Sequence, residues 1–146
     1  MDALDLRIRP PRSPRDRLDG LVFMPRTIDK IRATLPGGHL GPYHVFPGLS
    51  QMLLAAISVD LAALRDIVAG VRSDAEVAQW LKIHADTSQY PRANAMLSEW
   101  RHDTLRDDHR ARFEASYPDY LRARYALGFD LIDADDRELY PVLRNR

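Results

Sequence analysis

Apolar side chains recur every three or four positions along most of the chain, which is the spacing of one face of an α-helix. The clearest run spans residues 61–71, and residues 49–59 are apolar nearly all round, as expected of a buried central helix. Similar spacing predicts helices over residues 27–35, 73–84, 93–105 and 107–127. Strand-like sequence is confined to Leu21–Met24, so the pattern predicts a mainly α-helical protein.

Residues that favour helix starts stand at several of these boundaries. Ser73 and Glu76 have the spacing of a capping box, in which a hydroxyl and a carboxylate each satisfy a backbone amide. Thr27 and Ser50 are the expected N-caps of the helices that begin near them. These signals support the helical prediction independently of the apolar spacing.

The two ends of the chain lack clear helical spacing. Residues 1–20 are rich in arginine and proline and are expected to form an extended arm, because proline fixes φ and cannot continue a helix. Pro118 is expected to bend the helix over 107–127 or divide it in two, and Gly128 to end it. The acidic residues 129–146 are expected to form a loop and a final short turn. The chain is therefore predicted to be a single domain, residues 1–146, with a compact helical bundle over 21–146 and an N-terminal arm.

Composition narrows the class of protein further. The chain carries 21 basic and 21 acidic residues, and this zero net charge argues against a dedicated nucleic-acid binder. A small basic excess in the first half and a small acidic excess in the second would suit a homodimer. Cysteine is absent, which excludes disulfides and thiolate chemistry. The longest apolar run, residues 52–57, is far shorter than the roughly 20 residues of a membrane span, and the sequence predicts a cytoplasmic protein.

Two phrases near the N-terminus are distinctive. They read Pro-Arg-Ser-Pro-Arg-Asp-Arg-Leu at residues 11–18 and Met-Pro-Arg-Thr-Ile-Asp-Lys-Ile-Arg-Ala at residues 24–33. Together with Tyr43-His44 and residues 73–85 and 131–136, they resemble a bacterial family known only as a domain of unknown function. The resemblance extends over almost the whole chain and implies a shared fold, but it implies no reaction.

The second phrase contains the first candidate site. Arg26 and Lys30 are four residues apart on one helix face, with Asp29 on an adjoining face. An arginine can hold a carboxylate or phosphate with two hydrogen bonds, and a lysine beside it can act as a base when its pKa is lowered. The alternative is an ion-pair cluster that fixes the arm to the core.

Tyr43 and His44 form the second candidate, in a loop bounded by prolines. Histidine is the natural general base near neutral pH, and a tyrosine hydroxyl can donate to a developing negative charge. Equally, both side chains could tie the loop to nearby backbone. Trp80 and His84, one turn apart on a predicted helix, are candidate substrate-binding residues, although His84 also suits a helix C-terminus for its interaction with the dipole.

No motif indicates a metal or a cofactor. His102 and His109 lie seven residues apart, but no HExxH pattern or Glu-x-x-His pair accompanies them. The acidic stretch from Asp133 has Glu138 where an EF-hand requires glycine. Nucleotide-binding glycine motifs and a nucleophile elbow are also absent.

Two functional hypotheses follow from these candidates. In the first, the protein is a small cofactor-independent enzyme, an isomerase, lyase or hydrolase. Arg26, His84 and Trp80 then bind an anionic small molecule, and His44, Asp29, Tyr43 or Lys30 moves a proton. In the second, the protein is a non-catalytic module that binds a small molecule or another protein, and the same residues are structural.

Overall fold

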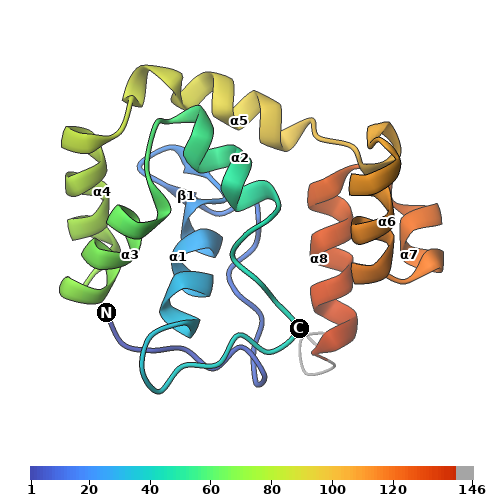
Figure 1. The fold of residues 1–146 in the computed structure, drawn as a ribbon, viewed down its shortest axis with the longest axis horizontal. Helices are drawn as coiled ribbons and strands as arrows, with labels where there is room; N and C mark the ends of the chain where they lie inside the picture. The colour runs from blue at the N-terminus through green and yellow to red at the C-terminus, as the bar shows by residue number, and fades with distance from the viewer. Residues whose placement is uncertain (141–146) are drawn as a thin grey trace. The chain divides into compact units, whose positions relative to one another are not determined.

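The structure is a computed structural model that describes residues 1–140 and leaves out the side chain of Asp107. Helices dominate these residues, as predicted, and a short antiparallel hairpin lies near the N-terminus (Figure 1). The elements in chain order are β1 (Arg17–Leu18), β2 (Leu21–Val22), α1 (Met24–Ala33), α2 (Leu49–Ala56), α3 (Leu61–Gly70), α4 (Asp74–His84), η1 (Thr87–Gln89), α5 (Tyr90–Ser98), η2 (His102–Thr104), α6 (Asp107–Ser116), α7 (Asp119–Arg124) and α8 (Gly128–Leu139).

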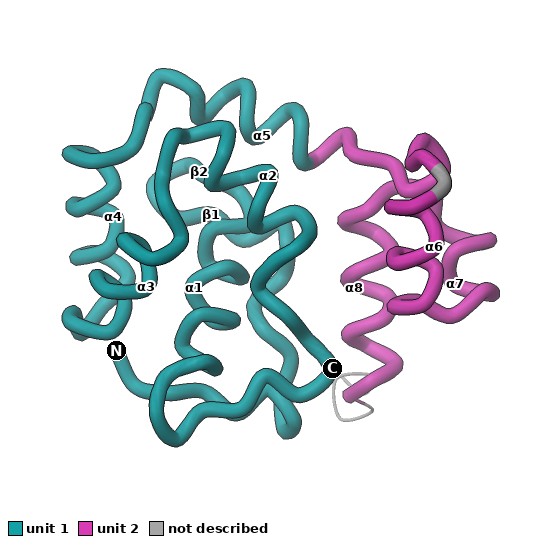
Figure 2. The backbone as a smooth tube through the Cα atoms, in the orientation of Figure 1, with its two compact units in different colours: residues 1–97 teal, residues 98–146 magenta. Residues whose placement is uncertain are grey.

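The chain divides into two compact units, residues 1–97 and 98–146 (Figure 2). Two such units can belong to one folding domain or to two, so the assignment of a single domain stays a prediction. Among the described residues, no helix is long and apolar enough to cross a membrane.

Helix α1 is the centre of the first unit. It contacts α2, α3 and β1, and within it only Lys30 and Arg32 are partly exposed (Figure 1). Sequence analysis expected residues 49–59 to form the buried central helix, and this expectation was wrong. Helix α2 ends at Ala56 and exposes Gln51, because it packs by one face through Leu53 and Leu54.

The expected extended arm is present and contributes to the core. Leu4 and Leu6 are buried beside Ala33, and both form backbone hydrogen bonds with His39. Further along, the arm becomes strand β1, which pairs with β2 in the register Arg17 to Val22. The strand-like segment Leu21–Met24 is therefore strand over only its first two residues.

Two expected helix caps were wrong. Helix α1 begins at Met24, before Thr27, and its N-cap is Phe23. The Thr27 hydroxyl is inside the helix and donates to the Phe23 carbonyl at 3.0 Å. The cap of α2 is Gly48, while the Ser50 hydroxyl is buried 2.9 Å from the Thr27 hydroxyl. Both side chains therefore join helices rather than cap them.

The next helices follow the sequence more closely. The Ser73 hydroxyl accepts a hydrogen bond from the Glu76 amide, and the Glu76 carboxylate accepts one from the Ser73 amide, which confirms the predicted capping box. Helix α5 begins at Tyr90 and ends at Ser98, earlier than the expected end near residue 105. A loop and η2 replace its predicted last turns.

The second unit contains the largest error of the sequence analysis. Pro118 separates α6 from α7, so the expected helix over 107–127 is divided in two rather than bent. Residues 128–139, however, form helix α8 instead of the expected loop. Gly128 begins this helix rather than ending the preceding one. The apolar residues of α8 are interleaved with aspartates that obscure their helical spacing. Its Leu131 and Ala134 pack with Leu121 of α7 in a small core.

Candidate functional site

Arg26 is the most unusual buried side chain of the first unit. It is 2% exposed although it carries a permanent charge. Its guanidinium carbon lies 5.3 Å from the centre of the Tyr43 ring, and its Nη1 donates a 3.1 Å hydrogen bond to the Arg12 carbonyl. A buried charge requires such partners, because its removal from water is otherwise costly. The structure thus brings the first and second candidates together.

Lys30 lies one turn further along α1 and completes this group. Its Nζ is 5.4 Å from the centre of the Phe23 ring, and its charge acts on His44. Partial burial lowers the pKa of His44, the positive charge of Lys30 lowers it further, and a hydrogen bond with the Pro47 carbonyl opposes both. The net direction is downward, which favours the neutral imidazole near pH 7. Arg26, Lys30, Tyr43 and His44 are hereafter the Arg26 cluster.

Phe23, beside this cluster, has a strained backbone. Its φ of 67° lies in the left-handed region, which an aromatic residue rarely adopts. Two hydrogen bonds hold it there, from the Phe23 amide to the carbonyls of Pro14 at 3.0 Å and Asp16 at 3.3 Å. Phe23 is the N-cap of the helix that carries the cluster, and Lys30 lies over its ring. Such strain is concentrated at functional sites.

Asp29 is engaged by the arm. Its carboxylate accepts hydrogen bonds from the Arg12 amide at 2.8 Å and from the Arg12 Nε and Nη2, both at 3.0 Å. The carboxylate is nearly buried, and Arg32 lies 3.9 Å away. This geometry matches the alternative in which an ion-pair cluster fixes the arm to the core.

Trp80 and His84 form a separate pair on α4. Their rings stack with centres 4.4 Å apart and planes 16° apart, and the His84 Nδ1 is 2.9 Å from the Trp80 carbonyl oxygen. Helix α4 packs against α3, and the ring stacking and the His84 hydrogen bond both lie within α4.

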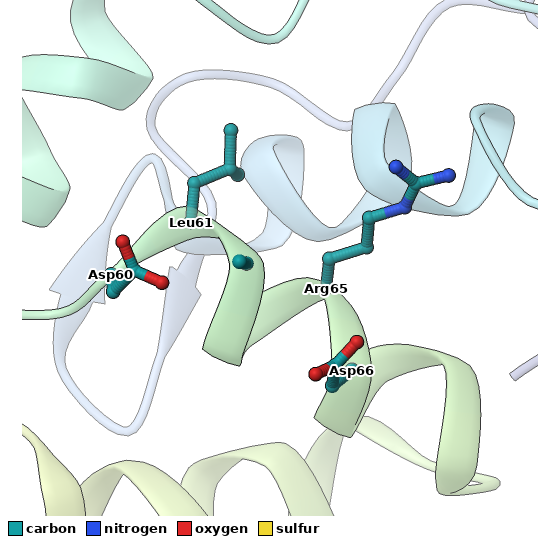
Figure 3. A pocket seen from close by; sticks show the side chains of 5 residues that line it. Asp60, Leu61, Arg65 and Asp66 are labelled. Carbon is teal, nitrogen blue, oxygen red and sulfur yellow. The ribbon is translucent and has the colours of Figure 1, made fainter.

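A surface hollow on α3 lies apart from these candidates. Its lining is Asp60, Leu61, Ala62, Arg65 and Asp66, all from this helix and its N-cap (Figure 3). The Asp60 carboxylate already accepts a hydrogen bond from the Ala63 amide at the helix N-terminus. A hollow formed by one helix and lacking the predicted residues offers little to position a substrate.

The two histidines of the second unit that the sequence singled out lie in different elements. His102 lies in η2 and His109 in α6, so the unbroken helix that would align them does not form. The His102 ring stacks on Phe113, and its Nε2 lies 2.9 Å from the Tyr125 carbonyl oxygen and 3.1 Å from that of Arg122. Among the described residues, no group of three or more His, Asp or Glu side chains could hold a metal ion.

Sequence reasoning missed the importance of Arg12. The sequence analysis treated the arginines of the arm alike. In the structure, Arg12 forms ion pairs with both Asp29 and Asp74. Asp74 is 62 residues away in the chain. The one available signal was that Arg12 stands inside the distinctive phrase at residues 11–18.

Comparison with known proteins places the chain in a family. The model of a family described as a domain of unknown function (DUF5069) matches residues 8–138. This range includes both distinctive phrases and every residue of the Arg26 cluster. A search of curated proteins found no match.

Proposed function

The chain belongs to the DUF5069 family, and we propose that it is a small enzyme that performs acid/base chemistry on an anionic small molecule at the Arg26 cluster. The observation that carries the proposal is the placing of two cations of one helix face beside adjacent loop residues: Arg26 lies against the Tyr43 ring, and the charge of Lys30 acts on His44, whose pKa is lowered by burial and by that charge. Proton transfer by protein side chains needs no cofactor.

The cations of the cluster are suited to an anion. A guanidinium presents a planar fork of donors that matches a carboxylate or a phosphate, and the Arg26 guanidinium lies against the Tyr43 ring. Lys30 adds a second positive charge one turn away. The two positive charges therefore favour a negatively charged ligand over a neutral one.

His44 is suited to accept a proton. A neutral imidazole has one ring nitrogen whose lone pair can accept a proton, whereas both nitrogens of a protonated imidazole are hydrogen-bond donors. Burial and the charge of Lys30 favour its neutral form in the free protein, and an anion bound beside it would favour the protonated form once the proton has moved. Tyr43, adjacent in the chain, has a hydroxyl suited to stabilise developing negative charge. Isomerase, lyase and hydrolase reactions all fit this arrangement.

Asp29 has a different part in the proposal. Its hydrogen bonds with the amide and guanidinium of Arg12 make it an anchor of the arm. Trp80 and His84 are also outside the proposed site.

A specific observation favours the second hypothesis, a protein-interaction module. Ile83, between Trp80 and His84 in the sequence, is 80% exposed on α4. An exposed apolar side chain beside a stacked aromatic pair suits contact with another protein. A single residue is a small patch, so we favour the enzyme.

Thermal-shift screening against carboxylate and phosphate metabolites tests the proposal. A ligand of the site should raise the melting temperature of wild type and of Lys82→Met, a control that removes an exposed lysine from α4. It should not raise that of Lys30→Met. Arg26 is too deeply buried for a clean first variant. If every ligand that stabilises wild type stabilises Lys30→Met equally, or if none stabilises wild type, the proposed site is wrong.

A further inference from the structure

Arg12 joins the arm to helix α1 through both its backbone and its side chain. Its amide and its Nε bind the same Asp29 oxygen, Oδ2, at 2.8 and 3.0 Å, and its Nη2 binds Oδ1 at 3.0 Å. The Nη2 also lies 3.3 Å from the Pro25 carbonyl oxygen. One residue of the arm is therefore held at several points on the first turns of α1.

The same guanidinium reaches helix α4. Its Nη1 donates to Asp74 Oδ2, and its Nη2 lies 3.3 Å from Asp74 Oδ1. Asp74 is the first residue of α4, where a carboxylate is also favoured by the helix dipole. Burial disfavours the charge of Arg12, but the hydrogen bonds with Asp74 and Asp29 outweigh it and raise the pKa of Arg12. The Arg12 guanidinium therefore forms ion pairs with two helices, α1 through Asp29 and α4 through Asp74.

The backbone carbonyl of Arg12 contacts Arg26. It accepts the 3.1 Å hydrogen bond from Arg26 Nη1. The N–H of the residue is thus fixed on Asp29 and its C=O on Arg26, and these two residues are one turn apart on α1. Since a guanidinium is planar, an acceptor at one Nη restricts the directions of its other N–H groups.

We propose that Arg12 is a positioning residue for Arg26, and that the ion pairs of Arg12 with Asp29 and Asp74 hold its carbonyl where it fixes the Arg26 guanidinium. Helix α4 thereby controls a site to which it contributes no residue. The functional meaning of this control rests on the proposed anion site, whereas the positioning itself does not.

Asp74→Asn tests the positioning without touching α1. It removes the outer ion pair and leaves the bonds of Arg12 with Asp29 in place. The first readout is the NMR signal of the Arg26 Nε–H in protein labelled with ¹⁵N-arginine, together with its hydrogen exchange. Hydrogen exchange of the Arg26 Nε–H should accelerate about two- to thirtyfold, which is the usual effect of a mutation on a residue coupled to it through a network of contacts. Arg7→Gln, which breaks an exposed ion pair with Asp5 in the same arm, is the control and should leave the signal unchanged.

Arg12→Gln should produce a larger acceleration than Asp74→Asn, since it removes both ion pairs. An Arg26 signal that is unchanged in folded Asp74→Asn overturns the proposal, whether or not Arg12→Gln folds. An equal effect of Arg7→Gln also overturns it, because general loosening of the arm would then suffice.

Inorganic phosphate supplies the second readout. If it binds wild type, Asp74→Asn should weaken that binding about two- to thirtyfold, and unchanged affinity contradicts control of the site by α4. If it and the screened metabolites fail to bind wild type, the proposed function fails. The Arg26 signal still decides the positioning, since it requires no ligand.

Discussion

Gly128 approaches Trp100 so closely that a Cβ atom on the glycine would lie 2.4 Å from a carbon of the tryptophan ring. The Gly128 amide also donates a 2.8 Å hydrogen bond to the Trp100 carbonyl. The close contact explains a glycine at the start of α8, where its backbone is not left-handed and other residues would be allowed.

Gly128→Ala should therefore lower the free energy of unfolding by about 1–3 kcal/mol, because the Trp100 ring must move. Gly70→Ala is the matched control, since α3 leaves open space at that position. It should be neutral or stabilise by up to about 1 kcal/mol, as alanine favours helix. Urea unfolding of both variants checks this, and equal stability of the two would show that the close contact is unimportant.

Ser50 and Thr27 join α1 to α2 through buried hydroxyls. Because the Thr27 hydroxyl donates to the Phe23 carbonyl, the Ser50 hydroxyl is the donor between them. Ser50→Ala should destabilise the protein by about 1 kcal/mol by removing that bond. Ser88→Ala, at an exposed serine of η1, should change stability by less than about 0.5 kcal/mol. A loss no greater for Ser50→Ala than for Ser88→Ala in urea unfolding would contradict this assignment.

Asn94 fixes the hairpin from helix α5. Its Oδ1 accepts from the Val22 amide at 2.9 Å, and its Nδ2 donates to the Gly20 carbonyl at 2.8 Å. Asn94→Asp keeps the acceptor but replaces the donor with an oxygen that faces a carbonyl. Both Asn94→Ala and Asn94→Asp should lose about 1–2 kcal/mol. Hydrogen exchange of the Val22 amide should accelerate in Asn94→Ala more than in Asn94→Asp, and the reverse order would refute the donor and acceptor assignment.

The capping box of α4 predicts a dependence of stability on pH. A hydrogen bond from the Arg72 amide, opposed by slight desolvation and aided by the hydroxyl and amide of Ser73, lowers the pKa of Glu76 below its ordinary value of 4.5. The stabilisation is present above pH 4.5 and is lost as the pH falls through the lower pKa of the folded state. Glu76→Gln should flatten the loss of stability as the pH falls below 4.5. A wild type and variant with parallel pH profiles would exclude this contribution.

Local signals in the sequence predicted much of the fold. The Ser73–Glu76 box predicted the start of α4, and apolar spacing predicted α3, because both features act over a single helix turn. Helix α8 escaped prediction because aspartates at positions 130, 133, 135 and 136 resemble a solvated loop, and Asp136 is nevertheless buried. Packing of α8 against α7 overrides such local composition.

The candidate site was predictable to the same extent. The i, i+4 spacing placed Arg26 and Lys30 on one face, and the structure brings Tyr43 and His44 to that face. The ion pairs of Arg12 with Asp29 and Asp74 depend on the path of the arm, which has no helix or strand at Arg12. No local pattern encodes that path.

The pKa of His44, followed by the ring-proton NMR signals, tests the proposed site most directly. In wild type it should lie below its ordinary value of 6.5, and it should rise in Lys30→Met but not in Lys82→Met. Phosphate or malonate bound at the cluster should raise it in wild type, since an anion favours the imidazolium. A His44 that titrates at its ordinary value, unmoved by Lys30→Met and by both anions, would contradict an acid/base site at the Arg26 cluster.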